Sequence, residues 1–490
     1  MVKTVIGEET QLNLAETRIS QSAIPAQVGL VIGKLSSDLD RGFVYDLIPT
    51  PQNDAGEPAC SLVETNKEKR KASKSKSQPA DSSFLAIDSD WVAEHARQVS
   101  RMLLGGMKVV GIYVWASDNA YKNSTMVLCQ TIKGVAEASP FMTTDLDERL
   151  LIHICYSPRR WTCRSCALTS NITSSSLRPS DFKVGKVLNS LQRFRCTYNF
   201  DIRLPILNGG ASNYQTLSEI LRQGIAIHAK ELRGARAVID GKLVIDNEPR
   251  ATDSLHEVEL FLPFMKDRGA EACSLKDVAG ILLFRSSVSS YAYLNSKEPV
   301  SQAVAEIKGD IIRSLQSRLD IICDEAVGEL VSTDYSVEKG KDEILSSKPT
   351  SQLVLHLSRK TCSVAFPRRV FVPWLAGIFI CDYLQQSESL EVLNDHCVEL
   401  MSMVALPDAS TILDLEVEAP SLITKSFWDV VLPFFSATSS SLDRSNTQAE
   451  AAESSRKSGK KLNFHIMLAV FFLFVSIIIG YVLYVRGNGI

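Results

Sequence analysis

The sequence lacks the short motifs that mark the common catalytic centres. It contains no G-x-S-x-G, no P-loop and no G-x-G-x-x-G, so neither a serine-hydrolase elbow nor a glycine-rich phosphate cradle is present. Its seven histidines form no H-x-H, H-x-x-H or H-E-x-x-H arrangement, which argues against the common hydrolytic metal sites. We therefore expect a protein that is not an enzyme, with no metal and no cofactor.

An excess of charge of one sign is also missing. The 490 residues carry 53 Lys and Arg against 56 Asp and Glu, a net charge of −3, which gives no reason to expect a nucleic-acid partner. The basic run at residues 67–76 can serve as a nuclear signal or contact anionic lipid, but a solvated charged loop is the plainer interpretation. Apolar residues make up 45% of the chain, enough for a sizeable core.

Cysteine is present in an odd number, eleven, without a metal-binding pattern. Cys163 and Cys166 form one C-x-x-C pair, but zinc sites usually add a second such pair or two histidines. A redox pair would need a helix that begins at the first cysteine, and the local sequence does not predict one. Two ordinary thiols on a loop are the simplest interpretation. A thiol hydrolase that uses Cys163, Cys166 or Cys397 is the alternative.

The first 160 residues predict a compact module of mixed α/β (α+β) type. β-Branched and apolar stretches alternate with stripes of helical spacing in the order β-β-α-β-α-β. Residues 50–83 are rich in Pro, Lys and Ser and predict a disordered insertion within this module. We expect strands at 27–35, 42–48, 109–115 and 150–156 and helices from 88 and over 119–137.

A second mixed α/β region is predicted over residues 161–435. Its clearest element is a long helix at 299–330, whose apolar residues recur three or four positions apart. Further strands are expected at 195–204, 258–262 and 279–284, and further helices at 214–232 and 388–403. Residues 436–461 are Ser-rich and mixed in charge, and predict a flexible tether.

A long apolar run follows that tether and predicts a transmembrane helix over residues 464–485. No charged side chain occurs from 466 to 485, and fourteen of these twenty residues are Leu, Ile, Phe or Val. At about 1.5 Å per residue, the run spans roughly 30 Å, the thickness of a bilayer's hydrocarbon core. A buried core helix and a cleaved lipid-anchor signal are the weaker alternatives. Representative residues of the predicted membrane anchor are Ile466, Leu473, Ile478 and Val485.

The flanks of the run predict its orientation. Basic residues precede it and a single Arg follows, so the positive-inside rule places the N-terminal side in the cytosol. The first residues show no apolar signal-peptide segment, which favours a single-pass, tail-anchored protein. The N-glycosylation sequons at Asn123 and Asn171 would then stay unmodified.

Two segments resemble a known family when they are taken together with this anchor. The first is Gly29-Leu-Val-Ile-Gly33 with the nearby Ser36, Pro49 and Thr50. The second is the more specific string Pro367-Arg-Arg-Val-Phe-Val-Pro373. In order and spacing, nearly the whole chain resembles the odorant-response-abnormal-four (ODR-4-like) family, and its divergence is similar to that of a plant-type member.

The resemblance implies a tail-anchored protein of the endoplasmic-reticulum membrane that assists folding or trafficking of multi-spanning membrane receptors. It also implies a partnership with the cysteine protease specific for the ubiquitin-fold modifier. The implied fold is an MPN-like mixed sheet with helices, without the metal site of active MPN proteases. The absence of H-x-H from this sequence agrees with a pseudoenzyme scaffold.

The Pro-Arg-Arg-Val-Phe-Val-Pro string also has a direct physical interpretation. The two prolines hold the segment extended, and its apolar residues favour a strand. The two arginines can then pair with carboxylates, either on a partner or inside this chain. The possible partner interface consists of Arg368, Arg369, Val370, Phe371 and Val372, and a structural strand with an internal Arg pair is the alternative.

Overall fold

A computed structural model describes most of the chain up to residue 426. The described residues are 2–36, 39–64, 83–141, 148–168, 173–207, 217–244, 255–262, 278–333, 367–385, 388–404, 409–416 and 423–426. The chain divides into units of residues 1–430 and 431–490, and every described residue belongs to the first. The predicted tether at 436–461 and the predicted transmembrane helix at 464–485 lie outside the described residues.

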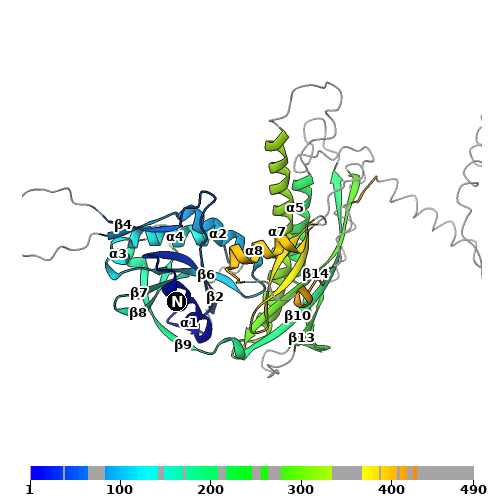
Figure 1. The fold of residues 1–490 in the computed structure, drawn as a ribbon. Helices are drawn as coiled ribbons and strands as arrows, with labels where there is room; N and C mark the ends of the chain where they lie inside the picture. Colours follow the sequence, from blue (N-terminus) through cyan, green and yellow to red (C-terminus); the bar gives the residue numbers. More distant parts are fainter. Residues whose placement is uncertain are drawn as a thin grey trace, which may run out of the picture. The chain divides into compact units, whose positions relative to one another are not determined.

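The N-terminal part of the chain is a closed β-barrel (Figure 1). Its seven strands follow one another in the order β1-β3-β2-β6-β7-β8-β9. The strands are β1 (Thr4–Glu8), β2 (Gln27–Ser36), β3 (Arg41–Pro49), β6 (Lys108–Trp115), β7 (Glu148–Tyr156), β8 (Arg159–Ala167) and β9 (Leu177–Gly185). The ring closes because β1 pairs in parallel with both β3 and β9, which leaves no free sheet edge. This closed barrel corrects the MPN-like mixed sheet that the resemblance implied.

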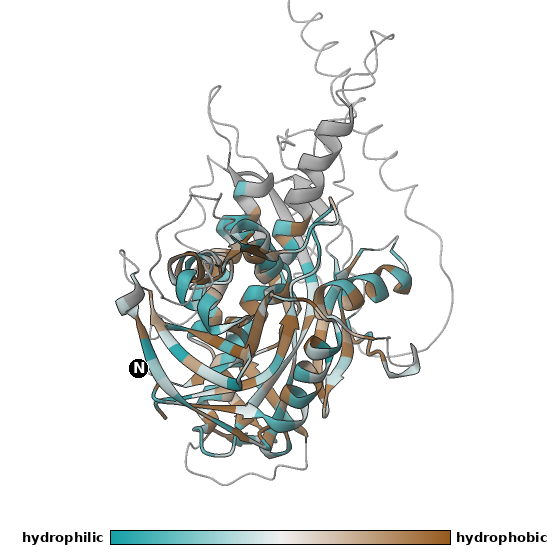
Figure 2. Cartoon of the chain, turned by 60° about the vertical axis from the view of Figure 1, so that its left-hand side comes forward, coloured by the Kyte–Doolittle hydropathy of each residue, from teal (hydrophilic) through white to brown (hydrophobic). Residues whose placement is uncertain are grey.

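The two faces of the barrel strands pack into different cores. Because side chains alternate along a strand, Leu150, Ile152 and Ile154 of β7 share one core with helix α1 (Glu9–Gln21). Leu151 of the same strand belongs to the other core, with helices α2 (Ser89–Met102) and α4 (Thr125–Ala138). Figure 2 shows apolar residues along these strands and hydrophilic residues along the outer sides of the helices. The near-continuous apolar strands of the sequence therefore reflect burial on both faces.

Local capping explains where the barrel's helices begin. The Asp88 carboxylate accepts a hydrogen bond from the Trp91 backbone N–H at 3.0 Å and caps α2. The single helix predicted at 119–137 is two helices, the short α3 (Asp118–Asn123) and α4, which meet at the buried Ser124. The Ser124 hydroxyl accepts a hydrogen bond from the Leu85 N–H at 2.6 Å, so the helix break docks a neighbouring strand.

That strand belongs to a hairpin inside the predicted insertion. Strand β4 (Cys60–Glu64) pairs antiparallel with β5 (Ser83–Ile87), so ordered backbone begins within the range 50–83 that we expected to be disordered. The side chains of Cys60 and Leu85 are buried in the core under α2 and α4, which supplies the apolar contact that holds the hairpin. Residues 65–82 lie outside the described part of the chain.

A second sheet follows the barrel in the order β12-β11-β13-β10-β14-β17. The strands are β10 (Leu191–Leu207), β11 (Arg236–Ile239), β12 (Lys242–Leu243), β13 (Leu255–Phe261), β14 (Val278–Asn295) and β17 (Ile423–Ser426). Helices α5 (Leu217–Arg233) and α7 (Val300–Thr333) share its core, so the long helix expected at 299–330 lies against this sheet. Residues 186–190 connect the barrel to the second sheet. The domain boundary predicted at residue 160 instead lies inside the β7–β8 hairpin.

A hairpin of β15 (Arg368–Leu375) and β16 (Ile378–Leu384), followed by helix α8 (Leu390–Met401), completes the main elements. The hairpin and α8 share the core of α2 and α4. The predicted Gly29–Gly33 segment lies in β2, where a side chain on Gly29 or Gly33 would collide with backbone carbonyls of β3 at 2.2 and 2.0 Å. These glycines therefore permit close contact between β2 and β3. No helix in the described part of the chain is long and apolar enough to cross a membrane.

Candidate functional site

The predicted partner interface lies mostly inside the protein. Arg369, Val370, Phe371 and Val372 of β15 are almost completely buried, with exposed fractions of 0–1%. Only Arg368 reaches solvent, where it pairs with Asp414 at 3.2 Å. Side chains that are this deeply buried cannot meet another protein while the fold is intact. We therefore correct the interface prediction for these four residues in favour of the structural alternative.

Arg369 instead belongs to a buried charge network. Its guanidinium donates to both carboxylate oxygens of Asp310 on α7, at 2.8 and 3.3 Å, and to the Ser289 carbonyl at 3.0 Å. The Tyr383 hydroxyl accepts a further hydrogen bond at 3.1 Å. Although burial acts against it, the Asp310 carboxylate raises the pKa of Arg369 above its usual value. The arginine is therefore charged and joins β14, β15, β16 and α7.

A second ion pair completes the network. Arg318 of α7 hydrogen-bonds Glu416, and both side chains are at most 1% exposed. Glu416 also accepts the backbone N–H groups of Ser289 at 2.8 Å and Arg369 at 2.9 Å. We call Arg318, Arg369, Asp310 and Glu416 the charge network. Its two cations match its two anions, which is the arrangement that buried charges require.

The C-x-x-C pair is not a joint metal site. Cys163 and Cys166 lie on strand β8, not on the loop that we expected, and their odd spacing directs them to opposite faces. Cys163 shares the core of α1, whereas Cys166 shares the core of α2 and α4. Burial raises the pKa of Cys163 to about 12, and a hydrogen bond to the Cys129 thiol, together with burial, raises that of Cys166. Neither thiol suits nucleophilic attack at neutral pH.

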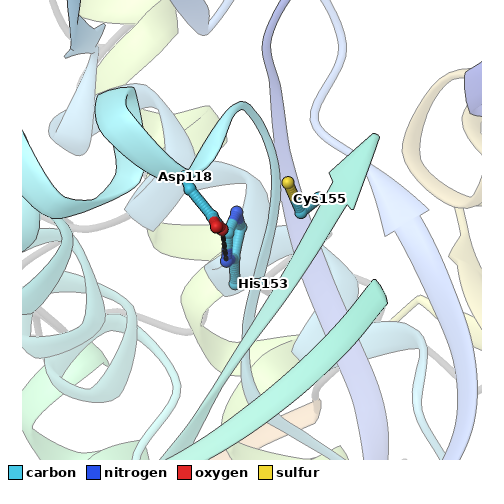
Figure 3. A group of neighbouring side chains, drawn as sticks. All are labelled: Asp118, His153 and Cys155. Atoms are coloured by element: carbon cyan, nitrogen blue, oxygen red, sulfur yellow. Dashed lines mark ion pairs between the residues drawn. The ribbon is translucent and has the colours of Figure 1, made fainter. Parts of the chain in front are cut away.

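A different polar group does bring ligand-forming atoms together. Asp118 begins α3, just after β6, while His153 and Cys155 lie two residues apart on the same face of β7. Their donor atoms all lie within 4.8 Å of one another (Figure 3). Figure 3 shows the Asp118 carboxylate directed at the His153 ring. We call these three residues the Asp118 cluster.

Neighbouring groups fix the state of the histidine in this cluster. His153 Nε2–H donates to the Ala116 carbonyl at 3.0 Å, because a carbonyl can only accept. His153 Nδ1 therefore carries no proton in the neutral ring and faces Asp118 Oδ1 at 4.0 Å. Burial lowers the pKa of His153, which favours this neutral form. The Tyr121 ring stacks on the imidazole at 4.1 Å between centroids and 4° between planes.

Asp118 is the exposed member of the cluster. Its side chain is 25% exposed, against 2% for His153, and Cys155 is completely buried. Burial alone would raise the pKa of Asp118, but hydrogen bonds from Arg160 and from the Cys155 thiol lower it below its usual value. The cluster therefore presents an ionised carboxylate, a neutral imidazole nitrogen and a thiol. An enzyme that uses Cys155 as nucleophile would need this thiol to become accessible.

A cavity of about 390 Å³, lined by other residues than this cluster, lies beside α7. Its charged lining is mostly basic, from Arg97, Arg101, Lys108 and Arg313, with Asp320 as the acidic member. Lys108 also lies over the Phe141 ring at 5.0 Å from the centroid. This lining favours an anionic group.

The Asp118 cluster carries no motif in the sequence, because its members are separated along the chain. Motif searches used the spacings of two histidines or two cysteines, while this group combines three residue types over 37 positions. One local signal was available: an H-x-C pair in a predicted strand places both side chains on one face. The aspartate could not be found this way, because only the β6–β7 pairing brings residue 118 next to residue 153.

The described fold is thus a mixed α/β protein with a closed barrel and a second sheet. The family model "Odorant response abnormal 4-like" matches residues 29–412, and the chain belongs to the ODR4-like family. It is 26% identical over 424 residues to the odr-4 homolog of Mus musculus, which covers 82% of this chain and 83% of that protein. The odr-4 homolog of Xenopus laevis is 24% identical, and the match covers 76% of this chain and 78% of that protein. The homolog of Dictyostelium discoideum is 25% identical, with 80% of this chain and 79% of that protein covered.

Among solved structures, a crystal structure of UfSP from C. elegans aligns with 84% of this chain and 58% of its own. The TM-score is 0.38 and the identity 8%. A TM-score at this level does not establish a shared fold.

Proposed function

We propose that this protein is a non-catalytic, membrane-anchored adaptor of the endoplasmic reticulum. In this role it recruits the cysteine protease specific for the ubiquitin-fold modifier and assists folding or trafficking of multi-spanning membrane receptors. Its N-terminal domain faces the cytosol and its C-terminal run spans the bilayer once. The match to the ODR4-like family over residues 29–412 is the observation that carries the proposal.

The chemistry of the described thiols supports a role without catalysis. Burial raises the pKa of Cys60, Cys163 and Cys397 to about 12 in each case, so these groups stay protonated at neutral pH. The adjacent His396 and Cys397 diverge on α8, since Cys397 is buried while the His396 side chain is 44% exposed and pairs with Asp382. These three thiols therefore do not suit a role as nucleophile.

Co-purification from membranes tests the adaptor role. The full-length chain is tagged, expressed and isolated from detergent-solubilised membranes, and the expected result is the modifier protease at near-stoichiometric level. A matched variant that lacks residues 464–485 should keep the protease but leave the membrane fraction. Recovery of the full-length chain without the protease would contradict the proposed partnership.

The glycosylation sequon at Asn123 tests the orientation. Asn123 is exposed at the end of α3, so a luminal domain would present it to the glycosylation machinery. We expect no glycan on the natural chain and a glycan on a sequon appended after Ile490. A glycan that disappears in Asn123→Gln would place the N-terminal domain in the lumen and refute the orientation.

The alternative function is a membrane-tethered thiol hydrolase acting on modifier conjugates, and the Asp118 cluster is the observation that favours it. The cysteines predicted for this role were Cys163, Cys166 and Cys397, but among the described cysteines Cys155 is the one that groups with an imidazole and a carboxylate. If conjugates are cleaved, Cys155→Ala should abolish cleavage, while Cys163→Ala should retain it. Cleavage that survives each of the four cysteine replacements would exclude these four thiols as the nucleophile.

A further inference from the structure

We propose that Asp118, His153 and Cys155 form a binding site for a divalent transition metal of the zinc class. The three side chains offer one oxygen, one nitrogen and one sulfur atom, all within 4.8 Å of one another. Zinc accepts these three donor types together, whereas calcium and magnesium prefer oxygen ligands alone. A water molecule is the natural fourth ligand, because a site with three protein ligands leaves one position open.

The nitrogen and oxygen ligands require only a small closure around an ion. Tetrahedral zinc with bonds of about 2.0–2.1 Å to nitrogen and oxygen holds these two ligands about 3.3 Å apart. His153 Nδ1 and Asp118 Oδ1 are 4.0 Å apart. A shift of less than about 1 Å, within reach of one side-chain rotation, brings the carboxylate oxygen to its ligand position.

The surroundings hold His153 and Asp118 in the state that a metal needs. The hydrogen bond from His153 Nε2–H to the Ala116 carbonyl leaves Nδ1 as the free lone pair, which is the usual outer-shell support of a metal-bound histidine. The Tyr121 stack prevents the ring from turning away. Arg160 binds Asp118 through Oδ2 and leaves Oδ1 toward the histidine.

The protein fold also provides an approach to the site. Asp118 is partly exposed, while His153 and Cys155 lie beneath it, so an ion entering from solvent meets the carboxylate first. On binding, Cys155 loses its proton to solvent, the thiolate binds the metal, and metal-bound waters leave as the three protein bonds form.

Cobalt and zinc binding to the purified full-length chain test the site. We expect a single Co²⁺ ion per chain, a thiolate-to-cobalt charge-transfer absorption, and zinc that raises the melting temperature. Cys155→Ser should remove the absorption and the thermal shift. The matched control Cys60→Ser, a buried thiol on β4, should leave both unchanged.

Two further variants protect the test against a folding defect. Asp118→Asn removes the charge of the exposed ligand while the buried ligands stay in place, and should weaken zinc binding about 10-fold or more. Arg160→Ala removes a cation beside the site and should tighten binding severalfold. A wild-type chain that binds neither metal, a Cys155→Ser chain that keeps the absorption, or unchanged affinity in Asp118→Asn would each overturn the proposal.

Discussion

The charge network and the Asp118 cluster are both made of ionisable side chains, yet they differ in how completely those side chains are used. In the charge network, two cations and two anions are buried, and both oxygens of Asp310 and of Glu416 accept hydrogen bonds. In the Asp118 cluster, His153 Nδ1 points at a carboxylate 4.0 Å away, beyond hydrogen-bond distance. Carboxylates whose oxygens all accept hydrogen bonds stabilise the fold, although Arg369 Nε has no hydrogen-bond partner among the described residues. An imidazole nitrogen that keeps its lone pair can instead bind a ligand.

The charge network also decides between two interpretations of an arginine-rich motif, as a partner surface or as an internal strand. The Pro-Arg-Arg-Val-Phe-Val-Pro string is compatible with a partner surface, because arginine is common at interfaces. Its arginines find their carboxylates within the chain instead, Arg369 on Asp310 and Arg368 on Asp414. The motif therefore specifies how β15 joins α7 and the 409–416 segment.

Removing a cation from the charge network should have the largest effect. Arg369→Met leaves Asp310 buried without its counter-ion, and we expect a loss of about 3–5 kcal/mol in the free energy of unfolding. Urea denaturation of the purified chain measures this loss. The neighbouring Arg368→Met should change stability by less than about 1 kcal/mol, because its pair with Asp414 is partly exposed. Equal free energies of unfolding for the two variants would contradict the view that only the buried pair of Arg369 contributes strongly to stability.

An intermediate effect is expected at His95, which is as buried as the charge network but has only neutral partners. Its Nε2–H donates to the Leu400 carbonyl at 2.9 Å, and the Thr50 hydroxyl donates to Nδ1 at 3.3 Å. Burial lowers the pKa of His95 to about 4. Between pH 6.5 and 4 the unfolded chain thus binds a proton here that the folded chain does not, and stability falls as the pH falls.

Comparison with His95→Gln isolates this contribution. Over that pH range, the wild type should lose about 3 kcal/mol more than the variant, as measured by denaturation at each pH. His396→Gln is the control of opposite sign, because the hydrogen bond to Asp382 raises the pKa of His396. His396 therefore contributes stability below pH 6.5 that is lost as the pH rises through its folded pKa. If the free energy of unfolding varied with pH in the same way in the wild type and in His95→Gln, the lowered pKa of His95 would not be the cause of the acid destabilisation.

The smallest effect is expected in the Asp118 cluster. Asp118→Asn breaks the pair with Arg160, whose side chain is 50% exposed, and should lower the free energy of unfolding by about 1 kcal/mol or less in metal-free buffer. Thermal unfolding without metal measures this change. A loss as large as that of Arg369→Met would mean that the cluster is a structural group like the charge network.

Local sequence patterns predicted most of the individual elements correctly. The strands expected at 27–35, 42–48 and 109–115 correspond to β2, β3 and β6, and the helix expected from 88 is α2, capped by Asp88. Patterns of this kind succeed because burial on one or two faces imposes a period on nearby residues. They failed where order came from distant contacts, as in the β4–β5 hairpin, which is held by Ser124 and the core under α4.

The sequence by itself determined the family, many of the individual strands and helices, and the apolar run at 466–485. The elements and the run follow from residues that are close along the chain. Only the tertiary structure decided that the first sheet closes into a barrel, since closure depends on β1 meeting β9 more than 170 positions away. It also decided that Arg369 is internal and that Asp118, His153 and Cys155 meet. The physical reason is the same in each case: strand pairing brings together side chains whose separation in sequence carries no local signal.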